Sequence, residues 1–200
     1  MPIKAIIWDI GGVIARTEDQ NPRNEFAVEL GVTRDRLEYL FFSGPEGTRA
    51  QKGEISRDEL MTYIRGELNL SPDAYPDLED RFFAGDQVDY ELVDFIRDLK
   101  TRYKIGIISN AWPEVAEVLD RWGIRDAFEH IVGSGDVGIM KPDPAIYHLS
   151  LDGLGIHPEE AVFVDDFLHN IEGAHQVGMK GVHFKNPDQA IADLNAILKE

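Results

Sequence analysis

The sequence predicts an α/β fold in which a parallel sheet is flanked by helices and a small all-helical domain follows the first strand. From residue 89 to residue 184, short apolar runs alternate with segments of helical period, which is the pattern of βαβ units and hence of parallel strands. Between residues 17 and 86 the spacing is helical throughout. We therefore expect a core domain formed by residues 1–16 and 87–200, with a helical insert over residues 17–86.

The expected strands are short apolar runs without the alternation of a half-exposed strand. They cover residues 5–8, 104–109, 129–133, 161–164 and 181–184. A continuous apolar run of this length is typical of a strand buried on both faces, as in the interior of a parallel sheet. The first of them, Ala5-Ile6-Ile7-Trp8, is followed at once by Asp9.

Four segments between these strands have the period of amphipathic helices. They cover residues 89–100, 113–122, 144–154 and 170–177. In the first, Leu92, Ile96 and Leu99 recur at helical spacing and so share one face. The third opens with Pro144, which is favoured in the first turn of a helix.

The insert contains four further segments with helical spacing. They cover residues 25–30, 36–42, 58–64 and 78–83, and turn signals at Gly31, Ser43-Gly44-Pro45, Gly53 and Ser71-Pro72-Asp73 separate them. Ser56 and Glu59, three residues apart, form a capping-box pattern at the start of the third segment.

Composition excludes several classes of function. The 37 acidic and 20 basic residues give a net charge of −17, which disfavours nucleic acid and anionic membranes as partners. The chain has no cysteine, so disulfides, thiolate nucleophiles and Cys-based metal sites are excluded. No secretory signal or membrane span is apparent, and we expect a cytoplasmic protein. An oligomeric state is not indicated.

Carboxylates follow two of the buried runs. Asp9 precedes Gly11 and Gly12, which permit a sharp turn or a close approach to a ligand. Such a carboxylate can be a nucleophile or a metal ligand, or it can simply cap the next segment. Asp165 and Asp166 are adjacent at the end of the run 161–164, and neighbouring carboxylates at a buried strand end repel each other unless a cation shares them.

Two weaker signals come from neutral and cationic residues. Ser109 and Asn110 end the run 104–109, where ordinary turn or capping roles are the more common explanation of such a pair taken alone. Lys141 lies between Gly138 and Pro142 in a stiff loop ahead of a helix, and a solvated surface lysine is its alternative. Ligands bind at the edge where parallel strands end, so these residues are expected to meet there.

Taken together, the four motifs resemble those of the haloacid dehalogenase superfamily of hydrolases and phosphotransferases. The matching segments, in order, are Trp8-Asp9-Ile10-Gly11-Gly12-Val13, Ile108-Ser109-Asn110, Lys141-Pro142-Asp143-Pro144, and Phe163-Val164-Asp165-Asp166 with Asn170. The resemblance covers nearly the whole chain and implies a Rossmann-like core with a small C1-type helical cap. Gly53-Glu54-Ile55-Ser56, Gly138 and Asn170-Ile171-Glu172-Gly173-Ala174 look closer to a bacterial subgroup that includes an α-glucose-1-phosphate phosphatase.

The resemblance also implies roles for these residues. Asp9 would attack phosphorus to give an aspartyl-phosphate, with Mg²⁺ held by the Asp9 and Asp166 carboxylates and the Gly11 carbonyl. Asp165 or Asn170 would support the metal. The Ser109 hydroxyl and the Asn110 backbone N–H would bind phosphoryl oxygens, and Lys141 would neutralise charge. The substrate would be a small phosphorylated metabolite, with sugar phosphates among the candidates.

One departure from the family pattern keeps alternatives open. Phosphatases of this superfamily typically carry a second aspartate, a general acid and base, two residues after the nucleophile, where this chain has Gly11. Proton transfer from a placed side chain contributes about 10²–10⁴-fold. The first hypothesis is still a phosphatase. A 2-haloacid dehalogenase and a binding or regulatory protein of low activity are the alternatives.

The residues that select the substrate are less clear. Four positions are candidates, although long cations are more often solvated and tryptophan more often packs; they are Arg16, Arg49, Lys52 and Trp112. Of the six histidines, His169 lies nearest the fourth motif and is a candidate for lining the pocket.

Overall fold

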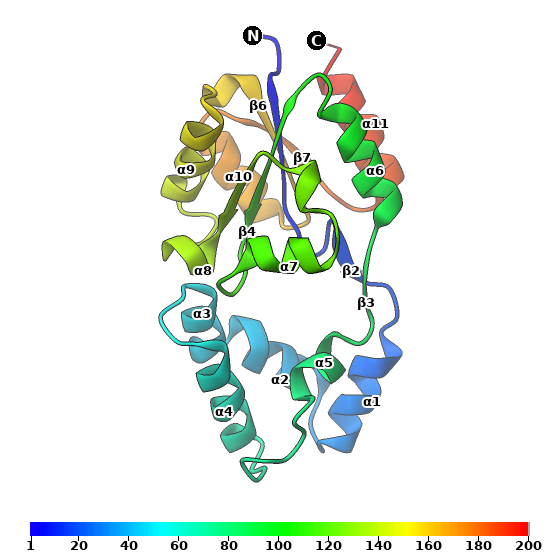
Figure 1. Ribbon diagram of the computed structural model, residues 1–200, viewed down its shortest axis with the longest axis vertical. Coiled ribbons are helices and arrows are strands. Elements are labelled where there is room, and N and C mark those ends of the chain that lie inside the picture. Colours follow the sequence, from blue (N-terminus) through cyan, green and yellow to red (C-terminus); the bar gives the residue numbers. More distant parts are fainter. Residues whose placement is uncertain (200) are drawn as a thin grey trace.

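The computed structural model describes residues 1–199, and its core is a five-stranded parallel sheet in the order β5-β4-β1-β6-β7 (Figure 1). The strands are β1 (Ala5–Trp8), β4 (Lys104–Ser109), β5 (His130–Gly133), β6 (Ala161–Asp165) and β7 (Lys180–His183). The surrounding helices are α6 (Tyr90–Leu99), α7 (Val115–Arg121), α8 (Ser134–Val137), α9 (Pro144–Leu154), α10 (Leu168–Gln176) and α11 (Pro187–Ile197), with two 3₁₀ turns at Arg125–Ala127 and Pro158–Glu160. The α/β fold expected from the sequence is confirmed.

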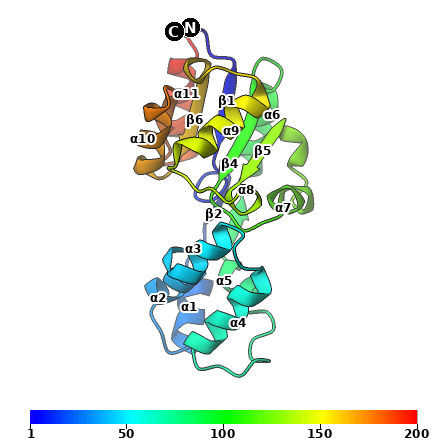
Figure 2. The same cartoon turned by 90° about the vertical axis from the view of Figure 1, so that its left-hand side faces the viewer.

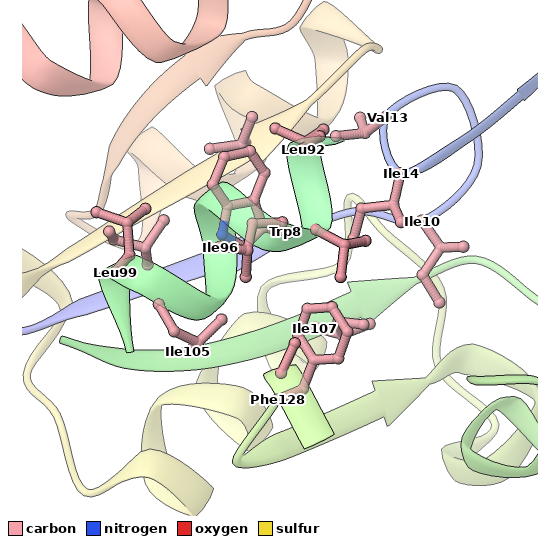
Figure 3. Packing of buried hydrophobic residues seen from close by; sticks show 14 of the residues in the cluster. Trp8, Ile10, Val13, Ile14, Leu92, Ile96, Leu99, Ile105, Ile107 and Phe128 are labelled. Atoms are coloured by element: carbon pink, nitrogen blue, oxygen red, sulfur yellow. The ribbon is translucent and has the colours of Figure 1, made fainter. Parts of the chain in front are cut away.

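The central strand β1 is buried on both faces because helices cover both sides of the sheet. Ile6 and Trp8 pack with α6, α7 and α11, and Figure 3 shows Trp8 beside Ile96 and Ile107 in this layer. Ala5 and Ile7 point to the other face, against α9 and α10. This two-sided burial explains why the strand is a continuous apolar run.

A second, separate core lies in the helical segment beyond the carboxyl ends of the strands (Figures 1 and 2). Its elements are α1 (Asn21–Glu29), α2 (Arg34–Glu38), a π-helix at Tyr39–Ser43, α3 (Pro45–Gln51), α4 (Arg57–Glu67) and α5 (Leu78–Phe83). We call this unit the cap. The Ser56–Glu59 capping box is present at the start of α4, as predicted.

Two short antiparallel strands, β2 (Ala15–Thr17) and β3 (Asp86–Val88), connect the cap to the core. The boundaries expected at residues 17 and 86 fall within this ribbon. The buried Arg23 guanidinium pairs with Asp86 at 2.9 Å and with Glu38 at 3.1 Å, so ion pairs join the cap to its connecting strand. No helix within residues 1–199 has the length and apolar character that crossing a bilayer requires.

Several elements differ from the sequence expectations. Pro45 is in the first turn of α3, so Ser43-Gly44-Pro45 ends one helix and starts another, which the sequence analysis treated only as a turn. The helix expected over 113–122 begins at Val115, because Glu114 has a left-handed backbone with φ of 73°. The ribbon, α8 and α11 were not predicted.

Candidate active site

The sheet order brings three of the four motifs to adjacent strand ends. In the paired register, Trp8 lies between Ile107 and Val164, so the residues that follow leave the sheet side by side. The Asp9 backbone N–H donates to the Val164 carbonyl at 2.9 Å. Asp9 is only 5% exposed, so its carboxylate emerges into a largely covered site at the cap-facing edge.

Lys141 reaches this edge from a loop and bridges two of the carboxylates. Its Nζ lies 2.8 Å from Asp9 Oδ1 and 2.6 Å from Asp165 Oδ2, and it donates to the Ile108 carbonyl at 3.1 Å. The lysine is 4% exposed, so these partners replace the hydration of its ammonium group. A solvated surface lysine, the alternative considered from the sequence, is therefore wrong.

The Asp165 carboxylate is fixed by donors on both sides. Asn170 Nδ2 donates to Asp165 Oδ1 at 3.0 Å and to Oδ2 at 3.1 Å, and the Phe167 backbone N–H donates to Oδ1 at 2.7 Å. With Lys141 also present, Asp165 makes charge-assisted bonds in several directions. It acts as the anchor that holds the lysine beside Asp9.

Asn110 has a role that the sequence analysis did not anticipate. Its Nδ2 donates to the Lys141 carbonyl at 3.1 Å, and its Oδ1 accepts from the Lys141 backbone N–H at 2.8 Å. This two-point contact ties the loop after β4 to the lysine loop. Ser109, 3% exposed, stands beside it at the end of β4. The asparagine side chain therefore sets the position of Lys141, whatever its backbone binds.

The donor set fits a hard divalent cation. Asp9, Asp165 and Asp166 each offer an oxygen, and these oxygens lie within 4.8 Å of one another. Asp166 Oδ1 is buried and has no hydrogen-bond partner among the described residues. Mg²⁺ prefers oxygen ligands, and a carboxylate oxygen without a hydrogen-bond partner is free to be one. The chain has no cysteine, so the site offers no thiolate that would favour a softer metal.

The raised pKa values of two of these carboxyl groups also favour a cation site. Burial raises the pKa of Asp9 to about 7, against the lowering effect of Lys141 and with repulsion from Asp165 and Asp166. Burial, followed by repulsion from Asp165, raises the pKa of Asp166 to about 6. Burial thus works against the charged form of Asp9 in the metal-free protein. A bound cation favours the ionised carboxylates.

Two consecutive glycines frame the cluster and differ in the space around them. A Cβ on Gly12, whose φ is +76°, would lie 2.2 Å from Asp166 Oδ2, whereas a Cβ on Gly11 would meet nothing within 4 Å. Gly12→Ala is expected to displace the Asp166 carboxylate and to lower the free energy of unfolding by about 1–2 kcal/mol, and a Mg²⁺ ion held by that carboxylate would bind more weakly. Calorimetric Mg²⁺ titration and urea unfolding measure both effects.

Gly11→Ala is the matched control for this substitution. It should leave Mg²⁺ affinity and stability near the wild-type values, because its methyl group enters open space and its carbonyl stays in the chain. Equal losses in the two variants would show that the whole loop, rather than the Gly12–Asp166 contact, controls the metal.

The weaker candidates from the sequence lie elsewhere or are already engaged. Arg16 joins the ribbon, donating to the Val13 carbonyl at 2.7 Å and to Asp89 at 2.8 Å. Arg49 pairs with Glu46 and Glu54 on the cap surface. The Trp112 ring packs with the cap aromatics, 5.8 Å from Phe83 and 6.2 Å from Phe41, so it joins core to cap. Lys52 is half-buried at the C-terminal end of α3.

Comparisons with known proteins agree with this geometry. A family model for haloacid dehalogenase-like hydrolases matches residues 3–178. The chain is 23% identical over 216 residues to bifunctional epoxide hydrolase 2 of Sus scrofa, covering 98% of this chain and 39% of that protein. It is 40% identical over 101 residues to glyceraldehyde 3-phosphate phosphatase of Pyrococcus furiosus, covering 50% of this chain and 42% of that protein. The chain thus spans about two-fifths of the length of these two relatives.

A third relative is the (S)-2-haloacid dehalogenase of Pseudomonas sp. (strain YL), 33% identical over 176 residues, which cover 86% of this chain and 75% of the dehalogenase. Among solved structures, a HAD family enzyme from Bacteroides thetaiotaomicron, in complex with magnesium and inorganic phosphate, superposes with a TM-score of 0.76 at 22% identity over 92% of this chain and 94% of its own. Because the family model spans most of the sequence and the fold agrees, the chain belongs to the haloacid dehalogenase-like hydrolases.

Proposed function

We propose that this chain is a Mg²⁺-dependent phosphatase that hydrolyses a small phosphomonoester through an aspartyl-phosphate on Asp9. The observation that carries the proposal is the cluster of Asp9, Asp165 and Asp166 around Lys141, in which Asp166 Oδ1 has no partner. One buried lysine cannot balance three ionised carboxylates and a phosphate dianion, so the site is suited to a further cation.

In this proposal Asp9 acts as the nucleophile. Among the described residues, the hydrogen-bond donors that contact the Asp9 carboxylate bind its Oδ1 atom. These donors are the Ile10 N–H, at 2.7 Å, and the Lys141 ammonium group. Oδ2 is then the oxygen that attacks phosphorus: a bond forms between Oδ2 and phosphorus, and the bond to the leaving oxygen breaks. Water next hydrolyses the acyl phosphate, releasing inorganic phosphate and restoring the carboxylate.

The other residues stabilise and orient the phosphoryl group. Lys141 brings positive charge to the Asp9 oxygen, while the Ser109 hydroxyl and the Asn110 backbone N–H would donate to phosphoryl oxygens. The Asp9 and Asp166 carboxylates and the Gly11 carbonyl would hold Mg²⁺, which neutralises phosphate charge when bound, with Asp165 in support. The cap, through its contacts with the core, would limit the entry of water.

The leaving group needs a proton, and Gly11 has no side chain that could donate it. A substrate whose leaving group departs readily, such as an anomeric or acyl phosphate, needs that proton least. Among sugar phosphates this favours the anomeric ones, in line with the resemblance to the α-glucose-1-phosphate phosphatase subgroup. The phosphatase from Pyrococcus furiosus and the magnesium and phosphate complex from Bacteroides thetaiotaomicron support the same chemistry. The cytoplasmic location stays a prediction.

A second candidate is dehalogenation of a 2-haloacid, which the 33% identical dehalogenase favours. That reaction also uses an aspartate nucleophile, but it has no need of a carboxylate cluster that attracts a cation. The cluster of Asp9, Asp165 and Asp166 is the feature that places phosphate chemistry ahead.

The deciding experiment treats the purified protein with EDTA, restores it with Mg²⁺, and measures release of phosphate from sugar phosphates, acyl phosphates and nucleotides. Halide release from 2-chloropropionate is measured in parallel. We expect phosphate release that EDTA removes and Mg²⁺ restores, with little halide release. Halide release that does not depend on Mg²⁺ would favour the dehalogenase, and inactivity in every assay would favour a binding or regulatory protein.

A further inference from the structure

The loop that follows the Asp165-Asp166 pair exposes a pair of apolar side chains beside the active site. Phe167 and Leu168 are each 54% exposed, and they follow directly after Asp166 in the chain. Consecutive Cα atoms are only about 3.8 Å apart, so the Phe167 side chain starts at the rim of the carboxylate cluster. Single exposed apolar residues are common on protein surfaces, and here two of them adjoin at the carboxylate cluster.

This loop is a short arch held firmly at both ends. Asp165 and Asn170 are buried and joined by the Asn170 Nδ2 bonds at 3.0 and 3.1 Å, while residues 167–169 between them are exposed. The Phe167 backbone N–H is held by Asp165 at 2.7 Å. The His169 ring lies 5.4 Å from the Phe167 ring at an interplanar angle of 48° and so braces it. The exposed ring is therefore positioned before any ligand arrives.

Local helix chemistry does not account for a phenylalanine here. Phe167 occupies the N-cap of α10 and makes no side-chain cap, at a position where Ser, Thr, Asp and Asn are strongly preferred. The ring is not needed by the sheet core either, since more than half of it is exposed. A large apolar side chain that serves neither the helix nor the core points to a role toward a ligand.

On another side of the site, the cap and the core are already in contact. Ser134 Oγ donates to the Gln51 carbonyl at 2.6 Å, and Gly53 approaches Gly135 so closely that a Cβ would lie 2.2 Å from the Gly135 carbonyl oxygen. Trp112 fills the cap aromatic cluster beside this contact. These contacts involve α3, α8 and the loop after β4, and none of them involves Phe167.

We propose that Phe167 is a specificity-determining residue whose ring packs against an uncharged, partly apolar leaving group of the substrate, such as an aryl group or the C–H face of a sugar ring. This inference rests on the proposed phosphatase function. The net charge of −17 supports an uncharged leaving group, because further anionic groups on the substrate would be repelled. Lys141, already shared between two carboxylates, is not free to pair with them.

The test compares benzyl phosphate with ethyl phosphate, two alkyl esters that differ mainly in the ring. Phe167→Ala should raise KM for benzyl phosphate roughly 3- to 10-fold with kcat nearly unchanged, and leave both constants for ethyl phosphate as they are, because it removes binding that is equal in ground and transition states. Phe167→Tyr should restore the wild-type KM. Tyr90→Ala is the control, since Tyr90 is also 54% exposed but lies on α6.

A binding measurement separates this inference from the proposed function. In Mg²⁺, benzylphosphonate should stabilise the wild-type protein against heat more than methylphosphonate does, and Phe167→Ala should remove the difference even if no ester is turned over. The inference would be overturned if Phe167→Ala changed KM equally for benzyl phosphate and ethyl phosphate. It would also be overturned if Phe167→Ala changed neither the KM values of the two esters nor the stabilisation by the two phosphonates. A change in the size-exclusion elution of Phe167→Ala without a change in KM would overturn it as well, because it would show that a second copy of the chain covers the ring.

Discussion

Replacing Asp9 by asparagine is expected to lower phosphate release to below about one part in 10⁴ of the wild-type rate. The amide keeps the shape of the carboxyl group but is too weak a nucleophile to form the acyl phosphate, and residues that act as a unit lose most of their effect when one is removed. Initial rates of phosphate release at saturating Mg²⁺, with the ester that the wild-type protein hydrolyses fastest, measure the loss.

The fold should tolerate this substitution. Burial is the largest influence on the Asp9 pKa and works against the charged form, so a neutral amide relieves that penalty while Lys141 keeps its bond to Asp165. The melting temperature is expected to stay level or rise. Asp188→Asn, on the exposed first turn of α11, is the control and should retain full activity. Substantial turnover by Asp9→Asn would remove the aspartyl-phosphate from the proposal.

The parts of the fold that were predictable are those whose stability comes from patterns within one segment. The run Ala161–Val164 predicts β6 because both of its faces are buried, and residues 144–154 predict α9 within its observed limits. The ribbon of β2 and β3 has three-residue strands, of which each is partly exposed, and their pairing joins residues about seventy positions apart. Such long-range pairing leaves little trace in either segment alone.

The helix α11 was missed although its signals are present. Asn186 caps it by accepting from the Gln189 N–H at 2.9 Å, and Pro187 occupies its first turn. These are the start signals that a sequence can show, and they could have been used to find the helix.

The sequence predicted that the strand ends lie at one edge of the sheet, but it did not predict the order of the strands there. The pattern puts Asp9, Ser109 and Asp165 at the carboxyl ends of parallel strands, and the strand order of the folded sheet makes those three ends neighbours. The Asn110 contact with Lys141 joins two loops, and its geometry depends on side-chain directions that spacing does not encode. The raised pKa of Asp9 likewise depends on how completely packing removes water, which appears only in the folded chain.

Replacing Lys141 by methionine is expected to have the second-largest effect, on both catalysis and stability. Methionine fills much of the same space but leaves Asp9 and Asp165 without the ammonium group that now lies 2.8 and 2.6 Å from them. Loss of a donor aimed at the reacting group should lower kcat by about 10²–10³-fold. Breaking a buried ion pair from one side should lower the free energy of unfolding by about 3–5 kcal/mol at pH 8.

The stability loss of Lys141→Met should increase with pH, because Lys141 lowers the pKa of Asp9. The folded-state pKa of Asp9, about 7, already lies above its unfolded value of 3.8, so the folded metal-free protein binds a proton more tightly and loses stability as the pH rises through that interval. Lys141 lowers the pKa of Asp9, and its removal therefore raises that pKa further and extends the interval upward. The deficit of Lys141→Met relative to wild type should accordingly be larger at pH 8 than at pH 5, by the part that comes from Asp9.

Urea unfolding at the two pH values, without metal, measures this difference, with Lys199→Met at the exposed end of the chain as the control. Mg²⁺ at pH 8 should recover part of the lost stability, because a cation among the same carboxylates replaces some of the missing positive charge. A deficit of the same size at pH 5 and pH 8 would instead assign the main contribution of Lys141 to its contacts with Asp165 and with the Phe163 ring, whose centre lies 5.3 Å from the ammonium group, rather than to Asp9.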